Sequence, residues 1–379
     1  MALDHPITKG GSAMAEVHLL VPVLAEVLPW NHARIDFLAH FILALVKVRT
    51  VNFSEIAVAF AGQAKQASKY KRIQRFFRAF PVDFSATSKL IVQMLPIRDL
   101  QWILTLDRTN WKLGRLNINI LLLGIAHTGI AFPIVWITLS KQGNSNTEER
   151  IQLMERFLRV FGRDKIKCLT ADREFLGHHW FSYLLKKLIH FCIRIRENML
   201  VTNVRGIPVH AKTLFRDLVP GEVRVLKGRR LVCGVKLFVV GLRLPNGEYL
   251  ILVTDKEPET AMEDYARRWE IETLFECLKS RGFRFESTHL TKPERINKLV
   301  ALLALTFCWC HLTGEWLHKQ KPIPIKKHGR KAKSIFRLGL DYLREMLLNV
   351  VEKMQEFKKM ILLLRKQLDL SPLAKPLRI

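Results

Sequence analysis

The stretch that decides the fold is Trp102–Leu139, with the sequence WILTLDRTNWKLGRLNINILLLGIAHTGIAFPIVWITL. Its β-branched and apolar residues favour strands. Gly114 and the Thr128-Gly129 pair interrupt them, and glycine at such positions favours a turn. The interruptions leave three runs, which are Trp102–Asp107, Asn117–Ala126 and Ile130–Leu139. The stretch therefore predicts a meander of three consecutive strands.

Helices and strands alternate after this meander. The apolar periodicity predicts a helix over Asn146–Phe161, a strand over Ile166–Ala171, a helix over Glu174–Leu188 and a strand over His190–Arg196. Three strands followed by helix, strand, helix and strand is the order of a ribonuclease H-like fold, an α/β fold with a mixed sheet and helices on both faces. Because the inference rests on element order, errors of a few residues at the ends do not affect it.

The chain of 379 residues is long enough for several domains. Helical periodicity before the meander predicts a helical N-terminal domain over residues 1–95, and the basic segment described below predicts that this domain binds DNA. The ribonuclease H-like catalytic domain is predicted over 96–198 and 260–315, interrupted by a β-strand insertion over 199–259. Residues 316–379 are predicted to form a basic linker and a C-terminal helix, which either contacts DNA, pairs protomers or packs on the domain's own core.

The charge of the chain points to a polyanionic partner. Lysine and arginine number 61 against 34 acidic residues, which gives a net charge of +27. Such an excess over most of the chain favours nucleic acid, although charge alone leaves structural RNA binding and anionic membranes open. Six cysteines without paired spacing are expected to be reduced, and the absence of a leader predicts an intracellular, cytoplasmic protein.

One N-terminal segment concentrates basic residues. Between Ile56 and Val82 there is no acidic residue, and aromatic residues are interspersed with lysine and arginine. The pattern predicts a DNA-contacting helix whose aromatic side chains anchor it to its domain, and the alternative is a solvated basic face. The candidate DNA-binding residues are Lys71, Arg72, Arg75 and Arg78.

Two aspartates follow predicted strands. Asp107 ends the first strand of the meander and Asp172 follows the fourth strand. Because these strands are neighbours in a ribonuclease H-like sheet, their ends can bring the two carboxylates together. Taken singly, each aspartate is commonly a turn or helix-cap residue.

The segment Tyr265–Lys279, YARRWEIETLFECLK, has two helical stripes. At about 100° per residue, Tyr265, Arg268, Glu272 and Lys279 fall within an arc of about 60°. Ile271, Leu274, Phe275 and Leu278 form a separate apolar stripe. One face can therefore enter a core while the other lines a site, and Glu276, one turn after Glu272, competes with it as a site carboxylate.

The spacing of these four polar residues resembles the signature of the insertion-sequence-4 group of DDE transposases, encoded by bacterial insertion sequences. The words Asp107-Arg-Thr-Asn-Trp and Asp172-Arg-Glu-Phe look like its two aspartate motifs, and the resemblance covers about residues 100–310. It implies that Asp107, Asp172 and Glu272 are the catalytic, metal-binding carboxylates. It also implies that Tyr265, Arg268 and Lys279 contact the phosphates of the transposon end.

Elementary chemistry agrees with this resemblance. Crowded carboxylates raise one another's pKa and are stable mainly with cations, and hard oxygen ligands suit Mg²⁺. Two such ions about 4 Å apart can drive phosphodiester hydrolysis and strand transfer. We expect two Mg²⁺ ions, with Mn²⁺ able to substitute, in a homodimer that binds terminal inverted repeats in double-stranded DNA, cleaves the ends and transfers their 3′-hydroxyls into a target.

Several alternatives stay open at this point. The chain could be a catalytically silent repressor derived from a transposase, or a stand-alone ribonuclease H-like nuclease. No Trp lies between Phe181 and Arg268, so a hairpin intermediate that stacks a flipped base there is in doubt. The base-stacking candidates in the insertion are Phe215, Phe238 and Tyr249, and the candidates for either phosphate contacts or structural ion pairs are Arg108 and Arg173.

Overall fold

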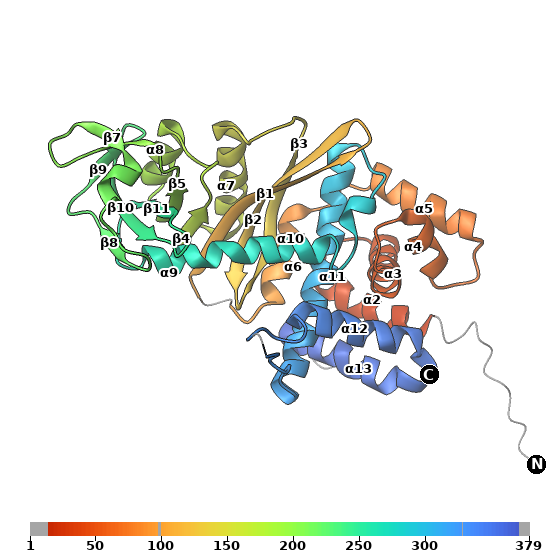
Figure 1. The fold of residues 1–379 in the computed structure, drawn as a ribbon. Coiled ribbons are helices and arrows are strands. Elements are labelled where there is room, and N and C mark those ends of the chain that lie inside the picture. Colours follow the sequence, from red (N-terminus) through yellow and green to blue (C-terminus); the bar gives the residue numbers. More distant parts are fainter. Residues whose placement is uncertain (1–13, 98–99, 328, 371–379) are drawn as a thin grey trace, which may run out of the picture. The chain divides into compact units, whose positions relative to one another are not determined.

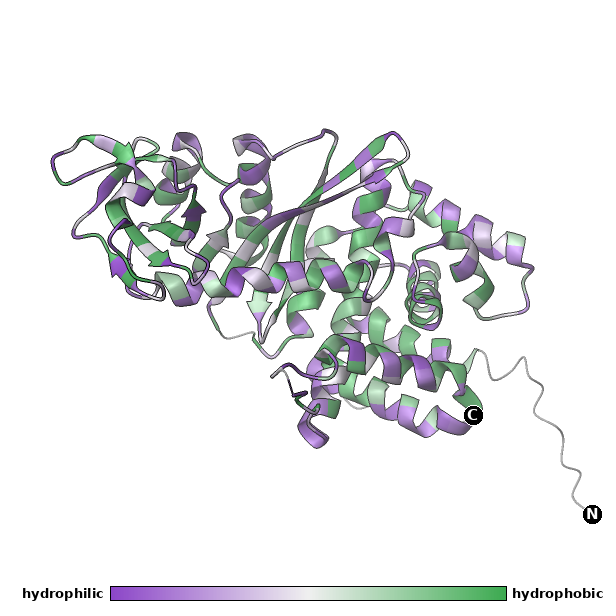
Figure 2. Cartoon of the chain, viewed as in Figure 1, coloured by the Kyte–Doolittle hydropathy of each residue, from purple (hydrophilic) through white to green (hydrophobic). Residues whose placement is uncertain are grey.

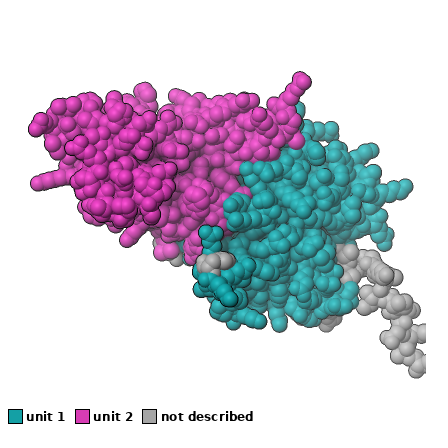
Figure 3. Space-filling view, in the orientation of Figure 1, with its two compact units in different colours: residues 1–98, 276–379 teal, residues 99–275 magenta. Residues whose placement is uncertain are grey.

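The computed structural model describes residues 14–97, 100–327 and 329–370 (Figure 1). The chain divides into two compact units, coloured separately in Figure 3. Unit 1 combines residues from 1–98 and 276–379, and unit 2 comprises 99–275. The predictions about a leader and about the outermost ends of the chain lie outside the described residues.

Unit 2 is built on one mixed sheet of eleven strands, in the order β3-β2-β1-β4-β5-β11-β10-β9-β6-β7, with β8 paired to β10. Its first five strands are β1 (Trp102–Leu113), β2 (Leu116–His127), β3 (Ile130–Leu139), β4 (Ile166–Ala171) and β5 (Phe191–Ile195). β1, β2 and β3 are antiparallel neighbours, whereas β4 is parallel to β1 and β5 is parallel to β4. The predicted ribonuclease H-like order is therefore confirmed.

Helices cover this sheet. α7 (Thr147–Phe161) packs on β2 and β3, α8 (His178–Lys186) packs on β10, and α9 (Ala261–Ala266) packs on β4, β5 and β11. The helix predicted from Glu174 begins only at His178. Tertiary contacts hold Glu174 outside the helix, because Arg108 binds its carboxylate at 3.2 Å and Arg150 binds its backbone carbonyl at 2.9 Å.

The insertion extends the same sheet. Its strands are β6 (Leu200–Thr202), β7 (Pro208–His210), β8 (Val223–Val225), β9 (Arg230–Val232), β10 (Val235–Arg243) and β11 (Tyr249–Thr254), with a 3-10 turn, η1, at Ala211–Phe215. β11 pairs antiparallel with β5, so the insertion joins the catalytic sheet directly. The single strand predicted over Leu231–Leu244 is split, because Cys233 and Gly234 adopt positive φ angles of 49° and 76°.

Unit 1 is helical in its described part. Its helices are α2 (Ala15–Val27), α3 (His32–Val48), α4 (Phe53–Ala59), α5 (Gln66–Ala79), α6 (Phe84–Gln93), α11 (Pro293–Gln320), α12 (Ile335–Leu348) and α13 (Val350–Gln367), with a 3-10 turn, η3, at Phe285–Ser287. The predicted C-terminal helix is therefore two helices. They separate at Asn349, whose φ and ψ of −120° and 47° are not helical. Residues 276–315 of the predicted catalytic domain belong to this unit.

α11 is the central helix of unit 1, and its middle is coloured as hydrophobic in Figure 2. This helix of 28 residues is long and apolar enough to cross a membrane, because an 18-residue window within it has a mean hydropathy of 1.5. However, 94% of that window is buried inside the protein. The burial is that of a core helix. α12 crosses α11 closely, because a Cβ added at Gly339 would lie 1.8 Å from the Cys310 carbonyl oxygen. The apolar face of α12 thus packs on the core of its own unit.

Candidate active site

The register of two neighbouring strands brings the aspartates together. β1 and β4 pair in parallel as far as Leu106 and Ala171, and Asp107 and Asp172 are the next residues. Neighbouring strands are about 4.8 Å apart, so the two side chains start from adjacent positions. Asp107 does not end its strand as predicted. It lies within β1, opposite Leu122, because β1 continues in a hairpin with β2 after β4 has ended.

The third carboxylate joins through Arg268. Nη2 of Arg268 donates to Oε1 of Glu272 at 2.7 Å, and Nη1 donates to Oδ2 of Asp107 at 3.3 Å. The hydroxyl of Tyr265 donates to Oδ1 of Asp172 at 3.3 Å. The structure therefore brings together five of the predicted site residues, with a guanidinium between two of the three carboxylates.

The predicted helical stripe is only partly realised. The chain passes through α9, a 3-10 turn at Arg267–Trp269 (η2) and α10 (Glu270–Leu278), so it is not one regular helix. Lys279 follows the end of α10, belongs to unit 1, and pairs with Glu286 at 3.1 Å. Its contact with a DNA end stays a prediction.

Asp107 is poised between its charged and neutral forms. Burial raises the pKa of Asp107 from 3.8 to about 7, and the nearby carboxylates of Glu174 and Glu272 add to the rise. The Arg108 backbone N–H, 2.7 Å from Oδ1, and the Arg268 guanidinium act in the opposite direction. A cation at this carboxylate would hold it in its charged form.

The donor set fits hard divalent metal ions. Asp107, Asp172 and Glu272 offer only oxygen atoms, which Mg²⁺ prefers. Within the described residues these oxygens are not all within 4.8 Å of one another, because Arg268 lies between two of the carboxylates.

Some charged residues near the site are held in ion pairs, and others are exposed to solvent. Arg108 binds Glu174 through two guanidinium nitrogens, at 3.3 and 3.2 Å, and also the side-chain oxygen of Asn119 at 3.2 Å. It is therefore a structural ion-pair partner. Arg173 is exposed and makes no ion pair within the described part of the chain. Glu276 pairs with Arg281 at 2.6 Å in unit 1, whereas Glu272 bonds to Arg268 beside Asp107.

Sequence reasoning missed two residues of the site. Thr105 is fully buried on β1, and its hydroxyl donates to the backbone carbonyl of Arg268 at 3.4 Å. Trp269 is 64% exposed, with its ring centroid 5.6 Å from the Arg268 guanidinium carbon. Among the earlier stacking candidates, Phe215 is fully buried, while Phe238 and Tyr249 are half-buried under arginine side chains. An exposed Trp in a charged segment is a signal that could have been found.

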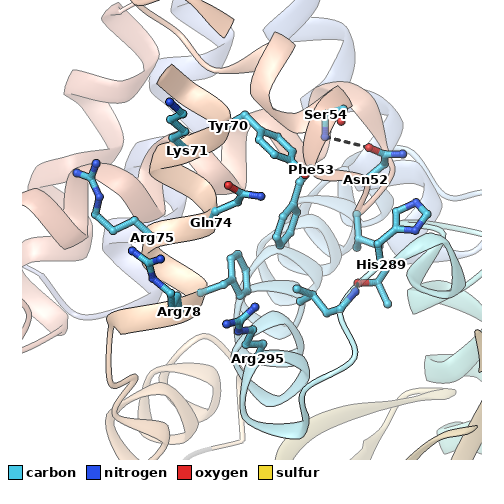
Figure 4. A pocket seen from close by; sticks show the side chains of 14 residues that line it. Asn52, Phe53, Ser54, Tyr70, Lys71, Gln74, Arg75, Arg78, His289 and Arg295 are labelled. Atoms are coloured by element: carbon cyan, nitrogen blue, oxygen red, sulfur yellow. Dashed lines mark hydrogen bonds between the residues drawn. The ribbon is translucent and has the colours of Figure 1, made fainter. Parts of the chain in front are cut away.

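A second candidate region is a basic pocket in unit 1, with a volume of about 620 Å³ (Figure 4). Lys71, Arg75 and Arg78 line it from one face of α5, and Arg295 lines it from α11. No ion pair engages these four in the described ranges, so their charges are open to an anion. Arg72 points elsewhere, because its Nη2 pairs with Oδ2 of Asp36 at 2.6 Å.

This chain resembles known proteins. The family model for the transposase DDE domain matches residues 102–309, which include the three carboxylates. Among solved structures, the chain is similar to a cryo-EM structure of the piggyBac transposase synaptic complex with hairpin DNA. The identity is 14% and the TM-score 0.47, over 96% of this chain and 84% of that one. The curated proteins yielded no match. Since the family model covers more than half of the sequence, the chain belongs to the family of transposase DDE-domain proteins.

Proposed function

We propose that this DDE transposase is encoded by a bacterial insertion sequence of the insertion-sequence-4 type and acts in the cytoplasm as a homodimer. It binds the terminal inverted repeats of double-stranded DNA, cleaves the transposon ends and transfers their 3′-hydroxyls into target DNA. The observation that carries the proposal is that Asp107 and Glu272 meet at Arg268, while Asp172, next to Asp107 in the sheet, is bound by Tyr265. A carboxylate cluster of this kind suits phosphodiester chemistry and is not needed for DNA binding alone.

In this proposal Asp107, Asp172 and Glu272 hold two Mg²⁺ ions, for which Mn²⁺ substitutes. Bound there, such ions activate a water or a 3′-hydroxyl and stabilise the leaving oxygen. Asp107 accepts a cation in its ionised form, which burial disfavours until the cation is present. If these two carboxylates held metal ions, they would no longer pair with the Arg268 guanidinium, which could then bind a phosphate with two donors.

The phenol of Tyr265 donates one hydrogen bond in the same direction. It donates to Asp172 in the structure, and a phosphate oxygen is an equivalent acceptor. Arg268 and Tyr265 therefore hold the scissile phosphate against the carboxylates, and Lys279 is proposed to add a point charge to that phosphate backbone.

Recognition of the ends is proposed to use the basic pocket of unit 1. Lys71, Arg75, Arg78 and Arg295 line the pocket around Tyr70, and no ion pair within the described residues engages their positive charges. Guanidinium and ammonium groups on one helix face are suited to successive phosphates of a duplex, which position the protein without reading bases. Because Arg72 is occupied by Asp36, it contributes to this surface mainly by holding α5 on α3.

Trp269 is proposed to stack on a base beside the cleaved strand. Its indole is exposed, lies next to the phosphate-binding Arg268, and stacking on an aromatic ring tolerates any base. A role of this kind would supply the aromatic platform that the insertion lacks.

Cleavage of a labelled duplex carrying the element's own end tests the proposal. Metal-dependent nicking in Mg²⁺, absent in EDTA and lost in Glu272→Gln, is the expected result. Glu276→Gln is the matched control, because it removes an exposed carboxylate one turn away that pairs with Arg281. Binding without cleavage would favour the repressor. Nicking without strand transfer from precleaved ends would favour the stand-alone nuclease.

A further inference from the structure

A buried cluster away from the carboxylate triad has unused ligand atoms. Cys168 on β4, His190 just before β5 and Asp264 on α9 place a sulfur, a nitrogen and a carboxylate oxygen within 4.8 Å of one another. All three residues are buried, with exposures of 0%, 5% and 3%. The β4–β5 register, which pairs Leu169 with Phe191, sets Cys168 beside His190.

α9 brings the third ligand atom from above these strands. Ala261 and Tyr265 of α9 share one core cluster with Cys168 and Cys192 of the sheet. Asp264 lies between them in sequence, and its Oδ1 also pairs with Nζ of Lys167 at 3.0 Å. Within the described residues its Oδ2 accepts a 3.4 Å bond from the Thr260 hydroxyl, and each carboxylate oxygen has a further lone pair for another partner.

The imidazole of His190 is oriented as a metal-binding histidine. Its Nδ1 lies 2.7 Å from Oδ1 of Asp255, a carboxylate that also accepts the backbone N–H of Phe191 at 3.0 Å. The carboxylate holds the proton on Nδ1 and leaves the lone pair on Nε2. That Nε2 atom is buried and has no hydrogen-bond partner among the residues that the structure describes. Histidines that bind metals commonly donate their other ring N–H to a carboxylate in this way.

We propose that Cys168, His190 and Asp264 form a buried site for a divalent transition metal, with Zn²⁺ as the ion that fits best. A sulfur, a nitrogen and an oxygen donor suit zinc rather than Mg²⁺. Ligand atoms about 2.0–2.3 Å from a tetrahedral ion are about 3.3–3.8 Å apart, so the cluster closes by at most about 1.5 Å on binding.

Charge and protons balance in this site. The thiol of Cys168 gives up its proton to solvent as the sulfur–metal bond forms, and the thiolate and the Asp264 carboxylate together neutralise the divalent ion. His190 binds as the neutral ring. Asp255 stays outside the site as the acceptor that fixes the ring, and the fourth position belongs to a water.

The ion would fasten α9 to the sheet. Asp264 directly precedes Tyr265, whose hydroxyl reaches Asp172, so the site fixes the helix residue next to one catalytic-site contact. The site is thus structural, and its soft thiolate ligand separates it from the oxygen-only triad.

Metal analysis and cobalt substitution of the full-length protein test the proposal. About one Zn²⁺ per chain is expected after purification without chelators. Replacement by Co²⁺ should give a thiolate-to-cobalt charge-transfer band in the near ultraviolet, which an oxygen-only site cannot give. Cys168→Ser and His190→Gln should lose the band. Cys277→Ser, a buried cysteine in unit 1, and Glu272→Gln should keep it.

The variant Asp255→Asn leaves the three proposed ligands unchanged and tests whether Asp255 positions the His190 ring. We expect its affinity for Zn²⁺, measured by competition with a chelating dye, to fall about 10–100-fold while far-ultraviolet circular dichroism is unchanged. Wild-type protein that holds no zinc and shows no thiolate band in excess Co²⁺ overturns the proposal. Retention of the band in both Cys168→Ser and His190→Gln overturns the assignment of these ligands.

Discussion

Replacing Asp107 by Asn separates what the carboxylate costs the metal-free fold from what it does in catalysis. Burial raises the pKa of Asp107 from 3.8 to about 7. The folded state therefore binds this proton more tightly than the unfolded state does. The stability from this group is fully present below about pH 4 and is lost as the pH rises through about 7.

The size of the effect follows from the shift. Each pKa unit corresponds to about 1.4 kcal/mol, so a shift of about three units sets an upper limit of about 4 kcal/mol. Arg268 at 3.3 Å and a side chain that is 18% exposed reduce the cost in solution. We take about 2 kcal/mol at pH 8, which corresponds to a rise of about 4–8 °C in the Tm of Asp107→Asn in EDTA.

The assay is thermal melting of wild type and Asp107→Asn between pH 5 and 8, in EDTA and in excess Mg²⁺. In EDTA the advantage of the variant should grow with pH. In Mg²⁺ only the wild type should gain stability, because the ion binds its folded state. Asp164→Asn, on a carboxylate that is 91% exposed, is the control and should change neither trend.

The same variant should bind the transposon end and fail to cleave it. Two results refute the reasoning about burial: a difference in Tm that does not depend on pH, or a wild type more stable than the variant at pH 8 in EDTA. Either would mean that Arg268 and the Arg108 N–H outweigh the loss of hydration at Asp107.

Four further predictions follow. Arg75→Ala and Arg78→Ala should each weaken binding of the transposon end and reduce the slope of log K against log salt concentration by about 0.9 per lost phosphate contact. Arg72→Ala should mainly lower the Tm, since Arg72 pairs with Asp36. Filter binding across a salt series measures both the affinity and the slope. Trp269→Ala should slow single-turnover cleavage by a factor worth about 1–3 kcal/mol of base stacking with no change in Tm, and an unaltered rate would contradict the stacking role. Gly339→Ala should cost about 1–3 kcal/mol or more in urea unfolding, because its Cβ would overlap the Cys310 carbonyl, and a neutral result would disprove the close helix crossing. In wild type, Ca²⁺ should tighten binding of a precleaved end, and Arg268→Gln should abolish that increase; equal increases in both proteins would exclude Arg268 from the coupling.

The element order was predictable because apolar runs with clear turn residues mark each strand. The position of Asp107 within its strand was not, since it depends on where β4 stops pairing with β1 while β2 continues. That information lies in partners far away in sequence. The sequence placed the two aspartates in neighbouring strands, and the register then made them adjacent.

Side-chain partners account for the other differences. Arg72 stands in the same basic run as Arg75, yet Asp36, 36 residues earlier, takes its charge. Glu174 favours a helix locally, yet Arg108 and Arg150 hold it in a loop. In both cases a long-range ion pair or hydrogen bond overrides a local preference, and one sequence without its fold does not reveal such a partner.

Arg268 joins metal binding to DNA binding in one side chain. It is 7% exposed, and the carboxylates of Asp107 and Glu272 pair with its charge. A buried guanidinium that loses these partners to metal ions has to find another anion, because an unpaired buried charge is costly. The scissile phosphate is the anion that the site is built to admit. Metal and DNA end should therefore stabilise each other's binding, and a transposase with this arrangement would assemble its full catalytic site only when both are present.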